Sequence, residues 1–548
     1  MTVSLFSVRS PLWRVLSKGI SRSLRRFKLH NERHFPWTVA DRRRRPEVLI
    51  EVNNMYSTHI AYSYLANVLA ERHGARIVGY VAQANRSRKE AFKAWAKRAI
   101  GYAPYGAYRS FGTGQVVTPV LTRAQKARAG RLFAQIYDGI ASKTDIEAMR
   151  VSGIWIGDLV YDAYLREYAR PTIIKASVEF VTSLRHSLEL FVFWQDYLDA
   201  HDVRAINVSH TVYGNAIPLR IAVARGIPVY QVNLTHCYRL DAEHLFAYGD
   251  FTTFRERFAA LPEAVRDAGL AEAQRRIERR FRGEVGVDMA YSTKSAFRAP
   301  FHPRLLSESP RKKILIAAHC FFDSPHSYGN NLFPDFYEWL DFLGQMSERT
   351  DYDWHIKTHP DFLPGSKEIA EAFVSKYQKL TMLPSDASHH QLIAEGIDVV
   401  LTCYGSVGFE YAALGVPVIN ASMNNPHIAF DFNVHARDVE HYRQLLLQLD
   451  ELPLVIDRQE VLAYYFMAFI HHSPNLFFSD YDGTIHCLGG YAKQFTPAIY
   501  DVWLDQWTLE QHEALLAALV TFVESEDYRM DERHLPPPAA ADVFPIPA

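Results

Sequence analysis

A Lys-Thr-His-Pro run ends one of the predicted strands in the second half of the chain. Residues 354–358 predict a strand, and Lys357, His359 and Pro360 fall at its carboxyl end. Pro360 ends the strand because it lacks the backbone N–H that a sheet ladder uses. A lysine and a histidine at such a place can hold a phosphate or stabilise it as it departs. The alternative is a histidine that is hydrogen-bonded to neighbouring backbone.

A second motif joins a strand to a helix in residues 402–419, TCYGSVGFEYAALGVPVI. Gly405 permits a tight turn. Ser406 begins the helix, where backbone N–H groups and the positive end of the dipole suit phosphate oxygens. Glu410 lies about one turn further on the same face, and its carboxylate can accept hydrogen bonds from a ribose diol. The alternative is an ordinary capping serine with a glutamate in the first turns of the helix.

A polar loop follows the first strand of the second half, in residues 317–331. It contains His319, Asp323 and His326, close to the carboxyl end of the strand. Such a loop either lines a ligand cleft or forms a solvated turn held by its own aspartate. Both interpretations are open at this point.

The first half of the chain offers three candidates for acid–base or nucleophilic chemistry. Asp158 and Asp162 are four residues apart, so both lie on one face of a predicted helix. His210 follows a predicted strand over 205–209. A carboxylate or imidazole there could act as a general base on an acceptor hydroxyl, or as a nucleophile. Asp158 could instead cap the helix after Gly157.

The elements that must position these residues alternate between strand and helix in both halves of the chain. Alternating strands and helices predict parallel sheets covered by helices, so the fold class is α/β with two Rossmann-like domains. Parallel sheets bind ligands beyond the carboxyl ends of their strands, so the motifs of both halves should face one cleft. The predicted strands cover residues 47–53, 75–81, 205–209, 227–232, 312–318, 354–358, 379–383, 399–403 and 416–420.

The predicted division of the chain follows these patterns and the changes in composition. Residues 1–45 form a basic segment, residues 46–290 the first domain and residues 291–465 the second, with a linker in 284–311. Residues 466–530 form a late helical segment that includes one long helix over 501–525. Residues 531–548 are a Pro-rich tail, which we expect to be loose.

The first 45 residues carry twelve Lys or Arg and only two acids, in a chain whose net charge is −1. Apolar residues such as Leu24 and Phe27 are spaced between the charges. This pattern is typical of a basic amphipathic helix on an anionic membrane surface, here over residues 1–30. It also fits a solvated tail or a first helix packed on the body. Nucleic acid is not expected as a partner, because the rest of the chain has no basic stripe.

Other classes of protein are excluded by composition and spacing. Hydrophobic residues make up 48% of the 548 residues and charged residues 22%, as in soluble globular proteins. The four cysteines lie far apart without a CxxC pair, so neither a disulfide framework nor a zinc site is expected. No uncharged apolar run is long enough to span a membrane. We expect a cytoplasmic protein, peripheral on the inner membrane face if the basic segment binds lipid.

Residues 312–450 resemble the GT-B glycosyltransferases of bacterial capsule and lipopolysaccharide synthesis, near the Kdo and sialic acid transferases. The pair His359–Pro360 and the segment 405–419 carry the resemblance. It implies that His359 and Ser406 contact the phosphate of a CMP-sugar and that Glu410 contacts the ribose. It also implies that the late helix crosses back onto the first domain. Many relatives have paired serines where this chain has Gly405–Ser406.

The function expected from the resemblance is transfer of a sugar, Kdo or sialic acid in type, from a CMP-activated donor to a glycan or lipid-linked acceptor. No metal and no further cofactor are expected, since Lys357, His359 and the helix dipole can offset the charge of the departing phosphate. Three alternatives remain, namely a UDP-sugar-dependent transferase, a UDP-sugar 2-epimerase on the same fold and a noncatalytic glycan-binding protein. The expected donor-binding residues are His319, Asp323, Lys357, His359, Pro360, Gly405, Ser406 and Glu410.

Overall fold

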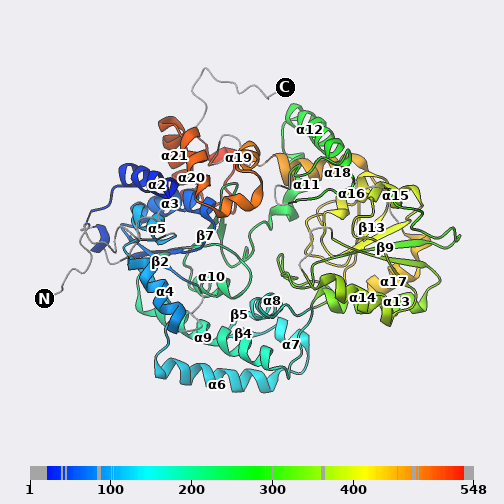
Figure 1. Ribbon diagram of the computed structural model, residues 1–548, viewed down its shortest axis with the longest axis horizontal. Helices are drawn as coiled ribbons and strands as arrows, with labels where there is room; N and C mark the ends of the chain where they lie inside the picture. The colour runs from blue at the N-terminus through cyan, green and yellow to red at the C-terminus, as the bar shows by residue number, and fades with distance from the viewer. Residues whose placement is uncertain are drawn as a thin grey trace.

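The computed structural model divides the chain into two α/β lobes joined by helices (Figure 1). It describes residues 21–38, 41–43, 46–82, 88–99, 101–102, 104–289, 292–298, 301–359, 364–452, 455–471, 477–478 and 481–535. Each lobe is built on a six-stranded sheet. The tail 536–548 and Pro360 lie outside the described residues.

The first sheet has the strand order β3-β2-β1-β6-β7-β8. All neighbouring pairs are parallel except β7 and β8, which run antiparallel. β1 is buried along its whole length, as the near-continuous apolar sequence of a central parallel strand requires. The strands are β1 (Glu47–Glu51), β2 (Arg76–Tyr80), β3 (Gln115–Val117), β6 (Val203–Val208), β7 (Val229–Val232) and β8 (Cys237–Leu240).

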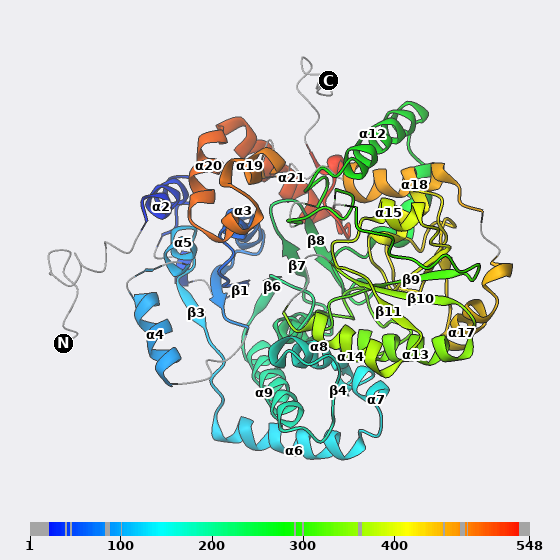
Figure 2. The same cartoon turned by 45° about the vertical axis from the view of Figure 1, so that its right-hand side comes forward.

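Helices cover both faces of this sheet, and some of them reach beyond one of its edges. Two short strands, β4 (Arg150–Val151) and β5 (Ile154–Trp155), form a separate antiparallel pair beside these helices. The α7–α8 region reaches toward the second lobe in both views (Figures 1 and 2). The helices are α3 (Tyr56–Arg72), α4 (Arg88–Ala99), α5 (Tyr105–Ser110), α6 (Arg123–Gly139), α7 (Lys143–Glu147), α8 (Gly157–Tyr168), α9 (Val178–Ala200) and α10 (Ile217–Val223).

The second sheet is entirely parallel, with the order β11-β10-β9-β12-β13-β14. Its strands are β9 (Lys313–Ala318), β10 (Asp353–Thr358), β11 (Leu380–Met382), β12 (Val399–Thr402), β13 (Val418–Asn420) and β14 (Val434–His435). Its helices are α13 (Phe336–Arg349), α14 (Ser366–Lys376), α15 (His389–Ala394), α16 (Val407–Ala413) and α17 (Val439–Leu447).

Both sheets have the same order when the six strands of each are counted along the chain, namely 3-2-1-4-5-6. This is the Rossmann order, in which the connections change direction between the first and fourth strands. Ligands bind at that switch point, beyond the carboxyl ends of the strands. In the first lobe the switch lies between β1 and β6, and in the second between β9 and β12. The structure thus confirms the predicted GT-B fold class, with two Rossmann-like domains.

A helical bridge connects the lobes and is built from segments far apart in the sequence. α11 (Phe254–Ala259) and α12 (Glu263–Phe281) pack with α18 (Arg458–Tyr465) and the π-helix Phe466–Ile470 around one aromatic core. Phe409 of the second lobe belongs to the same core.

The C-terminal helices pack on the first lobe, where they share a core with α3. These are α19 (Tyr481–Leu488), α20 (Ala498–Gln506) and α21 (Leu509–Ser525). The predicted single helix over 501–525 is therefore wrong. The chain leaves the helix at Trp507, and the Thr508 side chain accepts from the Gln511 N–H to cap a new one.

The helix in the basic segment, α2 (Arg22–His34), packs on α20. Phe27 is fully buried and stacks on Tyr500 with ring centroids 4.1 Å apart, and Leu24 is buried beside it. Arg26 pairs with Asp501 at 2.6 Å. Leu24 and Phe27 are thus covered by protein, as in the alternative of a helix packed on the body, while the membrane contact expected of residues 1–20 stays a prediction. Residues 1–20 lie outside the described part of the chain.

The length and hydropathy of the described helices show whether any of them could span a membrane. None of them is both long enough and apolar enough to cross a bilayer.

Replacing Phe27 by alanine should lower the free energy of unfolding by about 3 kcal/mol, because it empties a fully buried aromatic site. Leu29→Ala is the matched control, since Leu29 lies on the same helix with 62% of its surface exposed. Chemical denaturation of the three proteins measures both changes. Equal stability of both variants and the wild-type protein would contradict the docking of α2.

Candidate functional site

A cavity of about 490 Å³ lies at the switch point of the second sheet, where β9, β10 and β12 end. We name it the strand-end cavity. The sequence motifs that were far apart in the chain meet here, because parallel strands deliver their carboxyl ends to one edge. Its walls include His319, Asp323, Lys357, His359, Gly405 and Ser406.

Lys357 supplies the positive charge of this cavity. Its side chain is only 4% exposed, and among the described residues it has no hydrogen-bond or ion-pair partner. Burial lowers the pKa of Lys357 to about 8, against the opposing effect of Glu410 and Asp386. The ammonium group is therefore still mostly protonated at neutral pH. Glu410 and Asp386 form their direct ion pairs with Arg280 and His302 rather than with Lys357, so this buried ammonium can attract a further anion such as phosphate.

The two histidines at the strand ends differ in what they can do. His359 is exposed and lines the strand-end cavity. His319 is stacked on Phe336, and its Nε2 accepts from the Cys403 backbone N–H at 3.1 Å. Burial, with a smaller effect of His359, lowers the pKa of His319 to about 3. His319 therefore forms a neutral wall of the cavity rather than a cation.

The turn before α16 places Gly405 and Ser406 at the centre of the site. A side chain at position 405 would bring a Cβ within 2.9 Å of the Thr402 hydroxyl, to which the Gly405 N–H itself donates. Glycine suits this position because the Thr402 hydroxyl lies too close for a side chain, and not because the backbone has a positive φ. Ser406 precedes α16 without capping it, and its side chain is partly exposed to the cavity.

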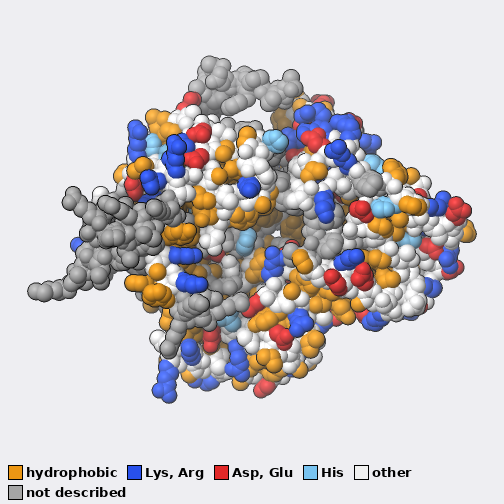
Figure 3. Space-filling view, in the orientation of Figure 1, with side chains coloured by type: hydrophobic (Ala, Val, Ile, Leu, Met, Phe, Trp, Pro, Cys, Tyr) orange, Lys and Arg blue, Asp and Glu red, His pale blue; other side chains and the backbone are white. Residues whose placement is uncertain are grey.

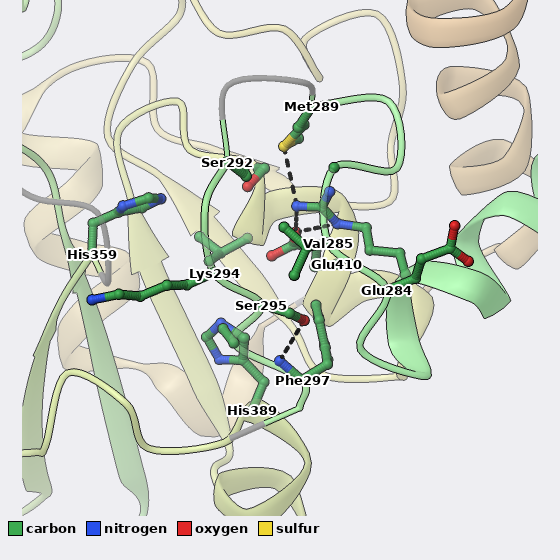
Figure 4. Close-up of a pocket in the computed structure, with 15 residues that line it drawn as sticks. Glu284, Val285, Met289, Ser292, Lys294, Ser295, Phe297, His359, His389 and Glu410 are labelled. Atoms are coloured by element: carbon green, nitrogen blue, oxygen red, sulfur yellow. Dashed lines mark hydrogen bonds and ion pairs between the residues drawn. The ribbon is translucent and has the colours of Figure 1, made fainter. Parts of the chain in front are cut away.

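Glu410 opens onto a second, smaller pocket of about 80 Å³ that adjoins the strand-end cavity at His359 and Ser406. We name it the linker pocket. The Glu410 carboxylate pairs with Arg280 from α12, whose Nε lies 2.8 Å from Oε1 (Figure 4). Both hydrogen bonds from the Arg280 guanidinium go to this one oxygen. The second oxygen is the one available for a hydroxyl pair on a ligand.

The walls of the linker pocket come from the segment that the sequence predicted as a linker. Met289, Lys294 and Phe297 surround the pocket, with His389 from α15 on the far side (Figure 4). Phe297 and His389 have ring centroids 5.2 Å apart. Sequence reasoning missed these residues, together with Arg280. The stretch 284–311, with its scattered Gly, Pro and Ser residues, contains no motif that marks them as site residues.

One predicted site residue of the second lobe reaches across to the first. Asp323 accepts a hydrogen bond from the Tyr213 hydroxyl at 2.7 Å. Tyr213 has φ 60° and ψ −177°, which is rare for a bulky side chain and marks a strained turn. After this turn the chain enters α10, which begins only at Ile217. Figure 3 shows the surface hollowed between the two lobes.

His210 lies in the same turn, at the switch point of the first sheet. Its side chain is open to solvent but surrounded by protein, and this desolvation lowers its pKa. Asp323 opposes the shift and Arg166 adds to it. His210 is thus neutral near pH 7 and able to accept a proton. Of the three expected acid–base residues in the first lobe, it is the one exposed to solvent.

Glu51 holds this turn in place and was not among the expected residues. It ends β1 and accepts from the Ser209 N–H at 2.6 Å and from the Asn215 amide at 3.0 Å. Burial raises the pKa of Glu51 to about 7, against these hydrogen bonds. An acid at the end of an apolar strand, EVLIE, was the signal in the sequence.

Asp158 does not face the cleft. It lies within the first turn of α8, which begins at Gly157, and its side chain does not cap the helix. It is 1% exposed and pairs with the equally buried Arg220 at 2.5 Å. Because its charge is neutralised inside the lobe, this placement argues against the expected role of Asp158 as base or nucleophile.

Asp162 is also buried, and it takes part in a contact between the lobes. It accepts from Nδ1 of His326 at 2.6 Å, while Nε2 of the same ring lies 3.0 Å from Glu147. Burial alone lowers the pKa of His326, but the charges and hydrogen bonds of Asp162 and Glu147 outweigh it and raise the pKa to about 10. Asp162 therefore binds an imidazolium of the second lobe, which does not fit a role as nucleophile.

Further polar contacts surround this ion pair. Asp335 of the second lobe accepts from the hydroxyls of Tyr161 and Thr172 at 2.5 and 2.6 Å. Lys143 of α7 pairs with Glu338. The α7–α8 region and the polar loop after β9 thus fix the two lobes to each other.

Replacing His326 by glutamine should lower the free energy of unfolding by about 3 kcal/mol near neutral pH, because two buried carboxylates lose their counter-charge. The pKa of His326 is raised on folding. Its contribution is therefore fully present below pH about 6.5 and is lost as pH rises through about 10.

Denaturation curves of the wild type and His326→Gln between neutral and alkaline pH measure this difference. His244→Gln is the control, since His244 also lies beside an aspartate but is 42% exposed. A gap between wild type and His326→Gln that stays constant up to pH 10 would contradict the buried imidazolium.

The described residues include no group of three or more His, Cys, Asp or Glu side chains arranged to hold a metal ion. The polar groups that line the strand-end cavity include an ammonium, an imidazole and a hydroxyl, those of Lys357, His359 and Ser406.

No protein-family model and no curated protein sequence matches the chain. Among solved structures, KpsC of Thermosulfurimonas dismutans, a beta Kdo 2,4 transferase, is 12% identical over 48% of this chain and 79% of that one, with a TM-score of 0.30. UDP-GlcNAc 2-epimerase from Neisseria meningitidis is 10% identical over 77% and 96%, with a TM-score of 0.21. Acinetobacter baumannii MurG is 12% identical over 78% and 96%, also at 0.21. At such scores the fold assignment rests on strand order alone.

Proposed function

We propose that the protein is a glycosyltransferase that moves a sugar from a nucleotide-sugar donor to a glycan or lipid-linked acceptor. The donor that we favour is a CMP-sugar. The observation that carries this proposal is the unpaired, buried ammonium of Lys357 beside Ser406 and Glu410 at a Rossmann switch point. The proposed reaction requires the donor and the acceptor and no further cofactor.

Each part of the donor would bind in a different part of the two pockets. The phosphate would lie in the strand-end cavity against Lys357, His359 and the Ser406 hydroxyl. The ribose would face the second oxygen of Glu410, whose first oxygen Arg280 already orients. The base would enter the linker pocket between Met289 and Phe297. The small volume of this pocket favours a pyrimidine over a purine.

The first lobe supplies the group that activates the acceptor. His210 is neutral and solvent-accessible at the opposing switch point, so it can take the proton of an acceptor hydroxyl as that oxygen attacks the anomeric carbon. The bond from that carbon to the phosphate breaks, and the electron pair leaves with the phosphate. Lys357 and His359 stabilise the charge that develops there.

Replacing Lys357 by methionine should weaken binding of CMP or UDP at least tenfold, since it removes the ammonium and keeps the length of the side chain. In the wild-type protein the affinity should also fall as pH rises through about 8, where Lys357 loses its proton. The variant should lack this pH dependence. Calorimetric titration at several pH values gives both results.

Lys367→Met is the control for that experiment, because Lys367 lies on α14 with 56% of its side chain exposed. Unchanged nucleotide affinity in Lys357→Met, or an equal loss in Lys367→Met, would contradict the assignment of the phosphate site. Absence of any nucleotide binding to the wild-type protein would favour the noncatalytic alternative.

Replacing His210 by alanine should lower kcat for transfer by about 10²- to 10⁴-fold, which is the usual contribution of a general base. Nucleotide affinity should stay unchanged, because His210 belongs to the other lobe. Initial rates and the titration described for Lys357 separate the two effects. A variant with full activity would remove His210 from the mechanism, and release of free sugar without acceptor would point to an epimerase.

A further inference from the structure

A third cavity, of about 240 Å³, lies between the lobes and meets the other two at Ser406. We name it the interlobe aromatic cavity. Nine tyrosine and phenylalanine side chains line it. They come from four parts of the chain, represented by Tyr238 in β8, Tyr328 in the loop after β9, Tyr404 before α16, and Tyr464 in α18. None of the expected site residues except Ser406 belongs to it.

Several buried polar atoms on its walls have no hydrogen-bond partner among the described residues. Both ring nitrogens of His427 are unpaired although its side chain is 1% exposed, and so is the hydroxyl of the equally buried Tyr238. Nδ1 of His236 and Nε of Arg529 are unpaired as well. A buried polar group without a partner is costly, and a polar ligand in this cavity could satisfy those of its lining residues.

The position of His427 is made possible by a glycine of the second sequence motif. A Cβ at Gly408 would lie 2.3 Å from Cε1 of the His427 ring. The absence of that side chain lets the imidazole rest against α16, two residues from Ser406. The other side of the ring meets Tyr464, with centroids 4.8 Å apart.

The cavity carries no surplus charge. Among its described lining residues only Asp250 and Arg529 are ionised, and they pair at 2.9 Å. Burial lowers the pKa of His427 to about 3, and burial together with Arg529 lowers that of His236 far below its usual range. Both imidazoles are therefore neutral, so His427 can donate one hydrogen bond and accept another, while His236, whose Nε2 is bonded to the Thr235 hydroxyl, has Nδ1 available.

We propose that the interlobe aromatic cavity binds one uncharged, hydroxyl-bearing sugar ring of the substrate. Aromatic faces pack against the C–H faces of a sugar ring, while unpaired imidazole, phenol and guanidinium groups suit its hydroxyls. An acyl chain would leave those polar groups unsatisfied. A carboxylate would meet no free cation. The volume of about 240 Å³ is large enough to take one sugar ring.

This inference rests on the proposed function, because it assigns the ring to a sugar nucleotide or its acceptor. It departs from the expectation of a Kdo- or sialic-acid-type sugar at this place, since both carry a carboxylate. The ring could belong either to the donor or to the acceptor, and both sources bring the same hydroxyl chemistry to the cavity.

Saturation-transfer NMR with methyl glycosides at millimolar concentration tests the proposal. The probes are the methyl β-glycosides of glucose, galactose and N-acetylglucosamine, and methyl β-glucuronide as the charged counterpart. At least one neutral glycoside should bind, with the glucuronide at least tenfold weaker. Tyr238→Phe should weaken the neutral glycoside about tenfold through one lost hydrogen bond, and His427→Leu should do so at least as strongly.

Tyr230→Phe is the matched control, because Tyr230 is 2% exposed in β7 and outside the cavity. No neutral binding, stronger glucuronide binding, or equal affinity in Tyr238→Phe and Tyr230→Phe would overturn the proposal. Nucleotide titration of the same samples keeps the two hypotheses apart. A protein that binds CMP or UDP but no neutral glycoside disproves this inference and leaves the proposed function standing.

Once a glycoside is found to bind, a competition experiment shows whether the ring in the cavity belongs to the donor or to the acceptor. Competition by an intact nucleotide sugar, but not by the free nucleotide, assigns the cavity to the donor sugar. Glycoside binding that persists with both assigns it to the acceptor. Either result supports the cavity as a sugar site.

Discussion

A buried imidazolium holds the two lobes in their relative positions. His326 lies between Asp162 and Glu147, and all three side chains are shielded from water. Any movement that separated them would leave charges buried without partners, which costs several kcal/mol. The loop that carries His326 also carries His319 and Asp323. The contacts of His326 with Asp162 and Glu147 therefore fix one wall of the strand-end cavity against the first lobe.

The chemistry of the cleft follows from that fixed arrangement. Each parallel sheet brings the ends of its first and fourth strands to the switch point, and the lobes turn these ends toward one another (Figure 2). The second lobe presents a cation, Lys357, whereas the first presents a neutral base, His210. This separation matches a transfer reaction, in which negative charge develops on one side and a proton is removed on the other.

Burial decides which titratable groups can act. His319, His427 and Asp158 have the residue types expected of catalytic groups, but the first two are neutral and the third is neutralised by Arg220. Lys357 keeps its proton because Glu410 and Asp386 limit the effect of burial.

The sequence alone determined the two Rossmann-like domains and the set of residues at the ends of β9, β10 and β12. Local periodicity fixes strands and helices, and parallel pairing then brings their carboxyl ends together. Only the tertiary structure decided the roles of Asp158, Asp162 and Glu410, because Arg220, His326 and Arg280 come from segments 62, 164 and 130 residues away. The docking of α2 was decided in the same way, since an apolar helix face looks alike in sequence whether a membrane or a protein core covers it.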